Sequence, residues 1–493
     1  MELLILPFAH VRVRVRCRAA LLAGLAAITL ASPAQADDLR GALVSAYQTN
    51  PTLQGARAQQ RGVDESVPLA RADGLPSVNA DASAIEFLKQ SSNNFVAPKR
   101  SIGAGIDLAV PIYSGGAVRN AIRAAKTRVE AGQEDLRGTE AAVFSQVVAA
   151  YMDVIRDSAI VGLSRSNVDV LTVNLRATSD RFEIGDLTRT DVAQSNSRLA
   201  LARGDLRSAQ ANLIASRERY IQVVGKAPVD LQPPPPLPGL PANPDDAVDV
   251  ALVTNPDLLA AKERSKAAGF DIEIAGSGRL PRISVFTGGD YTNFLGTLGG
   301  NIGTGVRQTS TTAQAGVRAT IPIFQGGRPA AQERRAQAQA AATYETEIAI
   351  ERDVIAQVRS AYSSLSAATE IIATNQTAVD ASALSLEGVR AENSVGNRTI
   401  LNILDAEQEL LRAQVQLVTA RRNAYVAGFS LLAAMGRAEA DDLGLDGGPL
   451  YDPEANYKRV KGKVWDWSFD PNPVAHSTRT VDTPAQDASI PPQ

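Results

Sequence analysis

The sequence repeats itself at an offset of 211 residues, and this repeat restricts the possible folds more than any other feature. The hexapeptide at 111–116, Pro-Ile-Tyr-Ser-Gly-Gly, recurs at 322–327 as Pro-Ile-Phe-Gln-Gly-Gly. Identical residues paired at this offset are Tyr151 and Tyr362, Gly185 and Gly396, Thr188 and Thr399, Leu199 and Leu410, and Gly225 and Gly436. An offset that holds over so long a stretch indicates a tandem duplication, so we expect one body built from two similar halves.

Each copy contains a long segment with a helical pattern. Proline is absent from 112–227 and from 330–448, although the chain has 26 prolines. In the return arm at 399–436, apolar residues recur every seven positions, at Ile403, Leu410, Leu417, Ala424 and Leu431. A seven-residue repeat predicts supercoiling against a partner helix, and each copy is therefore expected to form an antiparallel coiled-coil hairpin.

Before each helical hairpin the apolar period changes from 3.6 to 2, which predicts strand hairpins at 77–112 and 282–323. The strands at 102–112 and 313–323 each have one apolar and one polar face. Strands of about 9–11 residues with this alternation are typical of outer-membrane barrels, although a soluble hairpin packed on helices has the same pattern. Four strands cannot close a barrel, because the smallest barrels have about eight, so several chains would have to pool their strands.

The predicted organisation follows from these patterns and from the two ends of the chain. Residues 1–36 have the features of a signal peptide, with arginines before an apolar run and Ala34-Gln35-Ala36 at the end. The predicted parts are the signal peptide at 1–36, a first repeat at 37–232, a Pro-rich linker at 233–244, a second repeat at 245–438 and an irregular tail at 439–493.

Within each repeat the predicted order is helix, strand hairpin and helical hairpin. The first helical segments, 39–75 and 245–280, are each interrupted by an Asn-Pro pair. The helical hairpins are predicted at 114–225 and 326–436. The hairpin loops between strands are expected at 88–100 and 296–312, and residues 474–493 are expected to be disordered.

Residue inventory excludes most catalytic chemistry. Cys17 is the only cysteine, and His10 and His476 are the only histidines. Disulfides, Cys/His metal sites and His-based triads are therefore improbable, and we expect neither an enzyme nor a cofactor. The formal net charge of −3 offers no basic surplus for nucleic acid.

The doubled hexapeptide, the paired Asn-Pro segments and the run Gly-Asn-Arg-Thr-Ile-Leu-Asn-Ile-Leu-Asp at 396–405 resemble the TolC-like outer-membrane efflux proteins. The resemblance covers residues 38–440. It implies a mixed α and β membrane protein that forms a homotrimer, with a 12-stranded barrel in outer-membrane lipid and an α-helical barrel in the periplasm. It also implies a passive exit duct, working with a periplasmic adaptor (membrane fusion) protein and an inner-membrane pump of RND or ABC type. Whether the cargo is drugs, metal ions or secreted proteins stays open.

The resemblance assigns roles to residues at the hairpin tips. The periplasmic gate of the family has two acids three positions apart, which correspond here to Asn402 and Asp405. The latch between hairpins corresponds to Arg398 with Thr190 and Asp191. Without the resemblance, Asp405 would be interpreted as a solvated carboxylate on a coiled coil.

The same resemblance assigns the adaptor-docking tips to Gly185, Leu187, Val395 and Gly396. The strand-to-helix bends are predicted from the residues themselves, at Pro111, Gly115, Gly116, Pro322, Gly326 and Gly327. The paired glycines are also typical of phosphate-binding loops, but no Lys-Ser/Thr follows them, which favours a bend. The competing hypothesis is a soluble periplasmic coiled-coil adaptor or structural protein, which would be expected to carry a compact β-domain and one hairpin rather than two duplicated units.

Overall fold

The structure is a computed structural model that describes residues 38–90, 97–299, 305–445 and 450–490. The predicted signal peptide at 1–36 lies outside the described residues, and the predicted loops at 88–100 and 296–312 lie partly outside them. The described residues belong to one compact unit.

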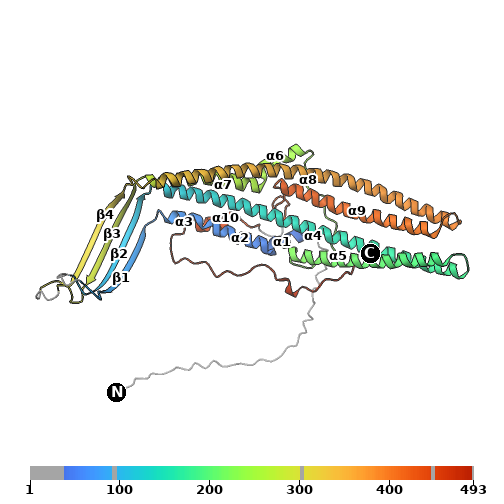
Figure 1. The fold of residues 1–493 in the computed structure, drawn as a ribbon, viewed down its shortest axis with the longest axis horizontal. Helices are drawn as coiled ribbons and strands as arrows, with labels where there is room; N and C mark the ends of the chain where they lie inside the picture. Colours follow the sequence, from blue (N-terminus) through green and yellow to red (C-terminus); the bar gives the residue numbers. More distant parts are fainter. Residues whose placement is uncertain (1–37, 91–96, 300–304, 446–449, 491–493) are drawn as a thin grey trace, which may run out of the picture. The chain divides into compact units, whose positions relative to one another are not determined.

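The two copies have the same order of elements: short helices, two strands, a long helix and a return helix (Figure 1). The first copy comprises α1 (Leu39–Thr49), α2 (Pro51–Asp64), α3 (Ser66–Ala72), β1 (Ser77–Glu86), β2 (Arg100–Tyr113), α4 (Ala117–Glu183) and α5 (Arg189–Val224). The second comprises α6 (Pro244–Thr254), α7 (Pro256–Gly276), a 3-10 turn (Ser277–Arg279), β3 (Arg282–Asn293), β4 (Thr309–Thr320), α8 (Arg328–Ser394) and α9 (Ile400–Ala434). The tail adds α10 (Pro453–Val460) and a second 3-10 turn (Thr480–Asp482).

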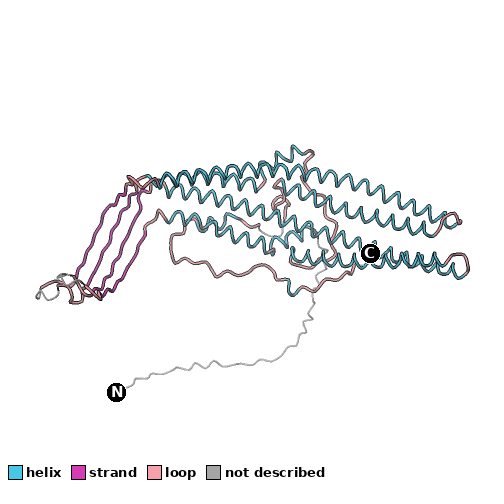
Figure 2. The backbone as a smooth tube through the Cα atoms, viewed as in Figure 1, coloured by secondary structure: helices cyan, strands magenta, loops and turns pink. Residues whose placement is uncertain are grey.

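The four strands form one antiparallel sheet in the order β1-β2-β3-β4 (Figure 2). The register aligns side chains of one kind across the sheet, because directly paired residues project from the same face. One face carries the row Val78, Leu108, Thr287 and Ala315, and the opposite face carries Asn79, Asp107, Gly288 and Gln314. The predicted apolar and polar faces are therefore continuous over both copies, and β1 and β4 form the two edges of the sheet.

The fourth strand differs from its prediction. It spans Thr309–Thr320 rather than 313–323, whereas β2 in the first copy continues through Pro111 to Tyr113. The end of β2 lies against β3, with an irregularity in the ladder between Pro111 and Tyr113. The pairing of β4 with β3 ends at Thr320, which lies opposite the first residue of β3. The Pro-Ile-Phe segment of the second copy thus has no strand to pair with among the residues that the structure describes.

The Asn-Pro pairs join the short helices to the ends of the return helices. The side chain of Asn50 caps α2, and its Nδ2 donates to the carbonyl of Val223 at 2.9 Å. In the second copy, Asn255 caps α7, and its Nδ2 donates to the carbonyl of Ala434 at 2.9 Å. Helix ends leave backbone groups without intrahelical partners, so one buried asparagine satisfies two helix ends in each copy.

The main hydrophobic core lies around the middle of α4. Its largest fully buried side chains include Phe144, Tyr151 and Tyr220, which join α4 to the return helix α5. The coiled coil predicted for the second return arm buries Leu404 and Leu417. Each long helix contacts its own return helix, and α7 contacts both α4 and α8, so the short helices join the two hairpins.

The tail is more ordered than its composition indicates. Residues predicted to be disordered lie along α5, where Arg217 donates to the carbonyls of Asp487 and Ser489 at 2.7 and 2.8 Å. These specific contacts with a helix outweigh the Pro-rich, polar character of the segment, so this prediction was wrong for the residues up to 490. In the described part of the chain, no helix combines the length and apolar character of a membrane span.

Candidate functional site

Each helical hairpin reverses direction in a short turn built on a left-handed glycine. Gly185 and Gly396 both have φ of 85°. In both turns, the amide of the residue after the glycine donates to a carbonyl five residues earlier, at 2.9 Å. This hydrogen bond closes the C-terminus of the long helix, and the positive φ explains why both copies have glycine there.

A threonine begins each return helix and is held by the residue three positions later. The Thr188 amide and hydroxyl donate to Asp191 Oδ2 at 2.9 and 2.7 Å. The Thr399 amide and hydroxyl donate to Asn402 Oδ1 at 3.2 and 2.8 Å. The hydrogen bonds from Thr188 lower the pKa of Asp191, because they stabilise its ionised carboxylate. The predicted latch residue Asp191 and gate residue Asn402 thus occupy the same repeat position and both cap a helix.

An ion pair also spans each tip. In the first copy the arginine precedes the turn and the acid follows it, and in the second copy this order is reversed. Arg181 contacts Asp186 at 2.7 Å in the first tip. In the second tip, Glu392 contacts Arg398 at 2.7 Å. All four side chains are about half exposed, so each pair contributes about 1 kcal/mol or less to stability.

The contacts of Arg398 differ from those of the predicted latch. Within the described residues its guanidinium pairs with Glu392 of its own hairpin, and its carbonyl accepts from Asn393 Nδ2 at 2.6 Å. Thr190 is exposed on the first turn of α5, and Asp191 is engaged by Thr188. The single chain therefore does not bring together the three residues of the predicted latch.

Asp405 forms an ion pair with the first hairpin. Its Oδ1 lies 2.5 Å from Nη2 of Arg198 on α5, and Arg198 also donates to Gln408. The Asp405 side chain is 55% exposed, so its carboxylate is partly neutralised but still reaches solvent. Asp405 was predicted as a gate residue, but its partner Arg198 was not predicted from the sequence.

A second polar contact between the hairpins centres on Glu407, which sequence analysis did not identify. Its carboxylate accepts from Asn174 Nδ2 on α4 at 2.9 and 3.0 Å and from Arg390 Nη2 on α8 at 3.0 Å. The Glu407 side chain is only 5% exposed. A buried carboxylate requires such partners, so Glu407 fixes the distance between the two hairpins close to their tips.

An apolar cluster surrounds these polar contacts. Its buried members come from three helices: α4, α5 and α9. They are Leu171, Leu199, Ala202 and Leu404. The hairpins are thus joined near their tips by apolar packing and by the Glu407 and Asp405 contacts.

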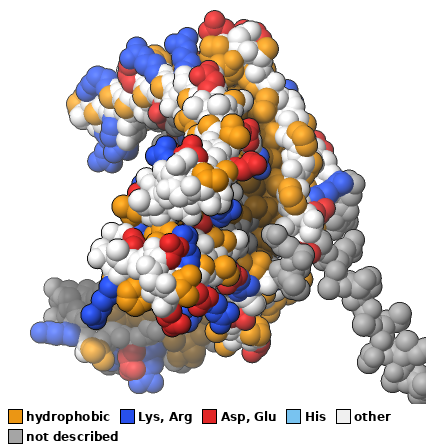
Figure 3. Space-filling model, turned by 90° about the vertical axis from the view of Figure 1, so that its right-hand side faces the viewer, with side chains coloured by type: hydrophobic (Ala, Val, Ile, Leu, Met, Phe, Trp, Pro, Cys, Tyr) orange, Lys and Arg blue, Asp and Glu red, His pale blue; other side chains and the backbone are white. Residues whose placement is uncertain are grey.

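The predicted docking residues lie at the outermost turns. Val395 is 70% exposed, and Leu187 is partly exposed. A Cβ added to Gly185 or Gly396 would meet no atom within 4 Å, so the backbone there is open to a partner. Acidic and basic side chains are interspersed on this face of the molecule (Figure 3).

The predicted strand-to-helix bends contain left-handed glycines in both copies. Gly115 and Gly116 have φ of 66° and 85°, and Gly326 and Gly327 have φ of 59° and 80°. A Cβ on Gly115 would lie 2.7 Å from the Leu280 Cβ, so this turn also packs closely against the second copy. In the described ranges, no group of three or more Asp, Glu, His or Cys side chains is placed to hold a metal ion.

Comparisons with known proteins agree with this architecture. The model of the outer membrane efflux protein family matches residues 42–226 and 247–437. Outer membrane efflux protein BepC of Brucella suis is 35% identical over 432 residues, which are 87% of this chain and 92% of BepC. Outer membrane protein TolC of Escherichia coli K12 is 24% identical over 439 residues, covering 86% of this chain and 87% of TolC.

Solved structures show the same fold. The Campylobacter jejuni CmeC outer membrane channel superposes with a TM-score of 0.72 at 16% identity, covering 86% of this chain and 89% of CmeC. The two matched segments of the family model correspond to the two copies of the repeat. The chain belongs to the outer membrane efflux protein family, and it is therefore an outer-membrane channel protein rather than an enzyme.

Proposed function

We propose that three copies of this chain form the outer-membrane exit duct of a tripartite export system. The observation that supports this proposal most strongly is the open four-stranded sheet. Among the described residues, strands β1 and β4 have only one neighbouring strand each, so each presents a row of unpaired backbone groups. Such groups cost several kcal/mol each in hydrocarbon, and three four-stranded sheets joined edge to edge would satisfy them in a closed 12-stranded barrel.

The two faces of the sheet support the same arrangement. The apolar face includes Val78, Ile106 and Val317, which are 60–67% exposed in the single chain. The polar face carries Asp81, Asp107 and other hydrophilic side chains. In the proposed barrel the first face contacts lipid and the second lines a water-filled lumen.

The long helices would continue this lumen through the periplasm to a gate at the tips. We assign the gate to Asp405 and Asn402, with three copies of each around the axis. Because Arg198 pairs with Asp405, the ring would carry less effective negative charge than three free carboxylates. The latch assigned to Arg398, Thr190 and Asp191 would then require contacts other than those seen in one chain.

The tips would also bind the partners of the duct. We assign adaptor docking to the turns around Gly185 and Gly396, with Leu187 and Val395 as their apolar contacts. An inner-membrane pump of RND or ABC type would supply the energy for export. As cargo we propose either small molecules such as drugs and toxic compounds, or secreted proteins; one relative, BepC, is named as an efflux protein, and another, AprF of Pseudomonas aeruginosa, as an alkaline protease secretion protein.

Two measurements test the function. Deleting the gene should increase the sensitivity of the parent bacterium to toxic compounds, and the purified protein should form cation-selective channels in planar bilayers. Unchanged sensitivity to every tested compound, together with unchanged protein secretion, would contradict an export role. Failure to conduct in bilayers under any condition would contradict the duct itself.

A further inference from the structure

The tail contains a closed loop, residues 459–470, that begins in the last turn of α10. Nη1 and Nη2 of Arg459 donate to the two carboxylate oxygens of Asp470, both at 2.7 Å. Lys463 Nζ adds a contact to Asp470 at 3.3 Å. These hydrogen bonds lower the pKa of Asp470, because they stabilise its ionised carboxylate. The loop is therefore held in a defined shape by charged side chains that point toward its base.

The same loop exposes its apolar side chains. Val464, Trp465, Trp467 and Phe469 are 62%, 72%, 73% and 78% exposed. The Trp467 and Phe469 rings meet edge to face, with centroids 6.5 Å apart. Large aromatic side chains gathered on one short loop and left uncovered indicate a binding surface rather than scattered surface residues.

The loop is attached close to the point where the chain enters the sheet. The Lys461 carbonyl accepts from Arg71 Nη1 of α3 at 3.3 Å. Helix α10 is fixed beside it, since Asn456 Nδ2 donates to Asp64 of α2 at 2.7 Å. Helix α3 ends at Ala72 and β1 begins at Ser77, so the loop lies at the junction between helices and strands.

We propose that loop 459–470 is an interfacial anchor whose Trp465, Trp467 and Phe469 insert into the phospholipid headgroup region of the periplasmic leaflet. This inference rests on the proposed barrel, which places the helix-to-strand junction at the periplasmic surface of the outer membrane. Tryptophan is enriched at membrane interfaces, where its ring is apolar and its N–H reaches water. Lys461 in the same loop suits the phosphate groups of these lipids, whereas Lys463 is paired with Asp470.

Tryptophan fluorescence gives a direct test, because Trp465 and Trp467 are the only tryptophans in the chain. The full-length protein is reconstituted into phosphatidylcholine vesicles, with or without bromine atoms on the acyl chains near the headgroups. We expect the emission to fall roughly twofold or more in the brominated vesicles. Emission that is unchanged by brominated lipid would overturn the proposal, and a blue-shifted but unquenched signal would assign the loop to a neighbouring protomer instead.

Variants separate the loop from the rest of the tail. Arg459→Ala removes the Asp470 contact and should weaken quenching, whereas Arg479→Ala, outside the loop, should leave it unchanged. Equal quenching in both variants would contradict the role of the closed loop in presenting the aromatics. Conductance of the same vesicles distinguishes the two proposals: conducting but unquenched protein contradicts the anchor alone, and failure to insert contradicts the barrel and the anchor together.

Discussion

The two long helices, α4 and α8, have 67 residues each and equivalent places in the repeat, yet they are buried differently. Helix α4 contacts α1, α2, α3, α5, α7 and α9 and buries side chains along most of its length. Helix α8 makes its main helix contacts with α6, α7 and α9. Its buried side chains are Pro329, Ala336, Ala340, Val354, Val358, Ala368 and Leu386. The first copy thus supplies most of the main core, and the second leaves a helix face uncovered.

One residue pair shows what this difference means. Ile160 and Ile371 are the same residue at the same repeat position. Ile160 packs against the main core, whereas Ile371 is 49% exposed. Other large apolar side chains of α8 are also exposed, namely Tyr344, Ile348 and Leu384. We infer that the uncovered face of α8 is buried between neighbouring protomers of the proposed trimer.

The largest expected effect comes from placing a charge at these paired positions. Ile371→Asp should abolish the trimer but leave the helical content of the chain unchanged, because the site is exposed in one protomer. Ile160→Asp should instead destabilise each chain by about 1–3 kcal/mol, because it places a carboxylate against the apolar core. Native mass spectrometry and circular dichroism measure the two effects. Similar behaviour of the two variants would contradict the inferred difference between the copies.

The asparagine contacts provide a test in which the two copies should behave alike. Asn50→Ala and Asn255→Ala each remove a helix cap and leave a return-helix carbonyl without its donor. Each should lower stability by about 1–3 kcal/mol, measured by thermal unfolding. Asn→Asp at either position keeps the cap acceptor but not the donor, and should therefore recover only part of the loss. A large loss of stability in one variant and none in the other would show that Asn50 and Asn255 are not equivalent.

The tips are expected to differ in function but not in stability. Arg181→Ser and Arg398→Ser each break one exposed ion pair and should change stability by about 1 kcal/mol or less. If Arg398 belongs to the latch, only Arg398→Ser should raise single-channel conductance. Equal conductance of both variants and the wild type would place the latch elsewhere.

Asp405 and Arg198 give a smaller, graded effect on ion selectivity. Arg198→Ala should increase cation preference, because it leaves the Asp405 carboxylate without its partner, and Asp405→Ala should reduce that preference. Asn402→Asp would add three carboxylates to a trimer and should strengthen block by divalent cations. Reversal potentials in bilayers measure the first two effects. If they stay unchanged in Asp405→Ala, Asp405 is an ordinary surface carboxylate.

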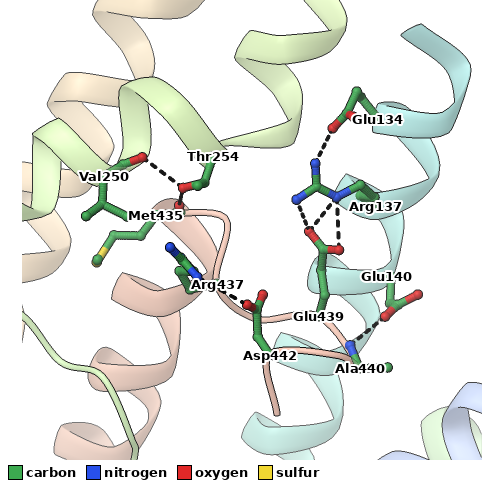
Figure 4. A network of polar contacts seen from close by, with 10 residues as sticks. All are labelled: Glu134, Arg137, Glu140, Val250, Thr254, Met435, Arg437, Glu439, Ala440 and Asp442. Atoms are coloured by element: carbon green, nitrogen blue, oxygen red, sulfur yellow. Dashed lines mark hydrogen bonds and ion pairs between the residues drawn. The ribbon is translucent and has the colours of Figure 1, made fainter. Parts of the chain in front are cut away.

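The smallest expected effect concerns the junction between the segment after α9 and helix α4. Beyond α9, Glu439 contacts Arg137 of α4 at 2.8 Å, and the Ala440 amide donates to Glu140 Oε1 at 2.7 Å (Figure 4). Burial raises the pKa of Glu140, so the folded chain holds its proton more tightly than the unfolded chain. Stability should therefore fall as the pH rises from the ordinary pKa of glutamate through the raised value.

Glu140→Gln tests this pH dependence, because glutamine still offers an oxygen to the Ala440 amide but does not ionise. Thermal unfolding should depend less on pH in the variant than in the wild type across that interval. Glu218→Gln offers a control, since Glu218 also accepts a tail amide, that of Gln486, but lies on the exposed side of α5. An unchanged pH profile in Glu140→Gln would assign the pH dependence to other groups.

Local patterns predicted most of the fold, because hydrophobic periodicity and the residues that end helices and strands act over short distances. Alternation identified the sheet faces, and the Asn-Pro pairs correctly marked the breaks between short helices. The observed ends of β4 differ from the predicted ones. They depend on pairing with β3, whose length local sequence does not encode. The ordered tail was missed for the same reason, since its contacts come from α2, α3 and α5.

At the tips, sequence located the turns and the residues that cap them. It did not locate Arg198 or Glu407, because their contacts depend on how α4, α5, α8 and α9 pack together. The only local signal was a charged residue, Glu407, close to the apolar seam of a coiled coil. For Arg398 the reverse holds. Its assigned partners, Thr190 and Asp191, came from the family resemblance, whereas its observed partner, Glu392, lies on the same hairpin.

Assembly is the central claim, because the barrel, the gate ring and the interfacial anchor all require more than one chain. Native mass spectrometry of the mature wild-type protein, released from detergent micelles, measures the number of chains directly. A mass of three chains that persists at low protein concentration is the predicted result. A single-chain mass from protein that retains its helices and conducts in bilayers would contradict the proposed trimeric duct.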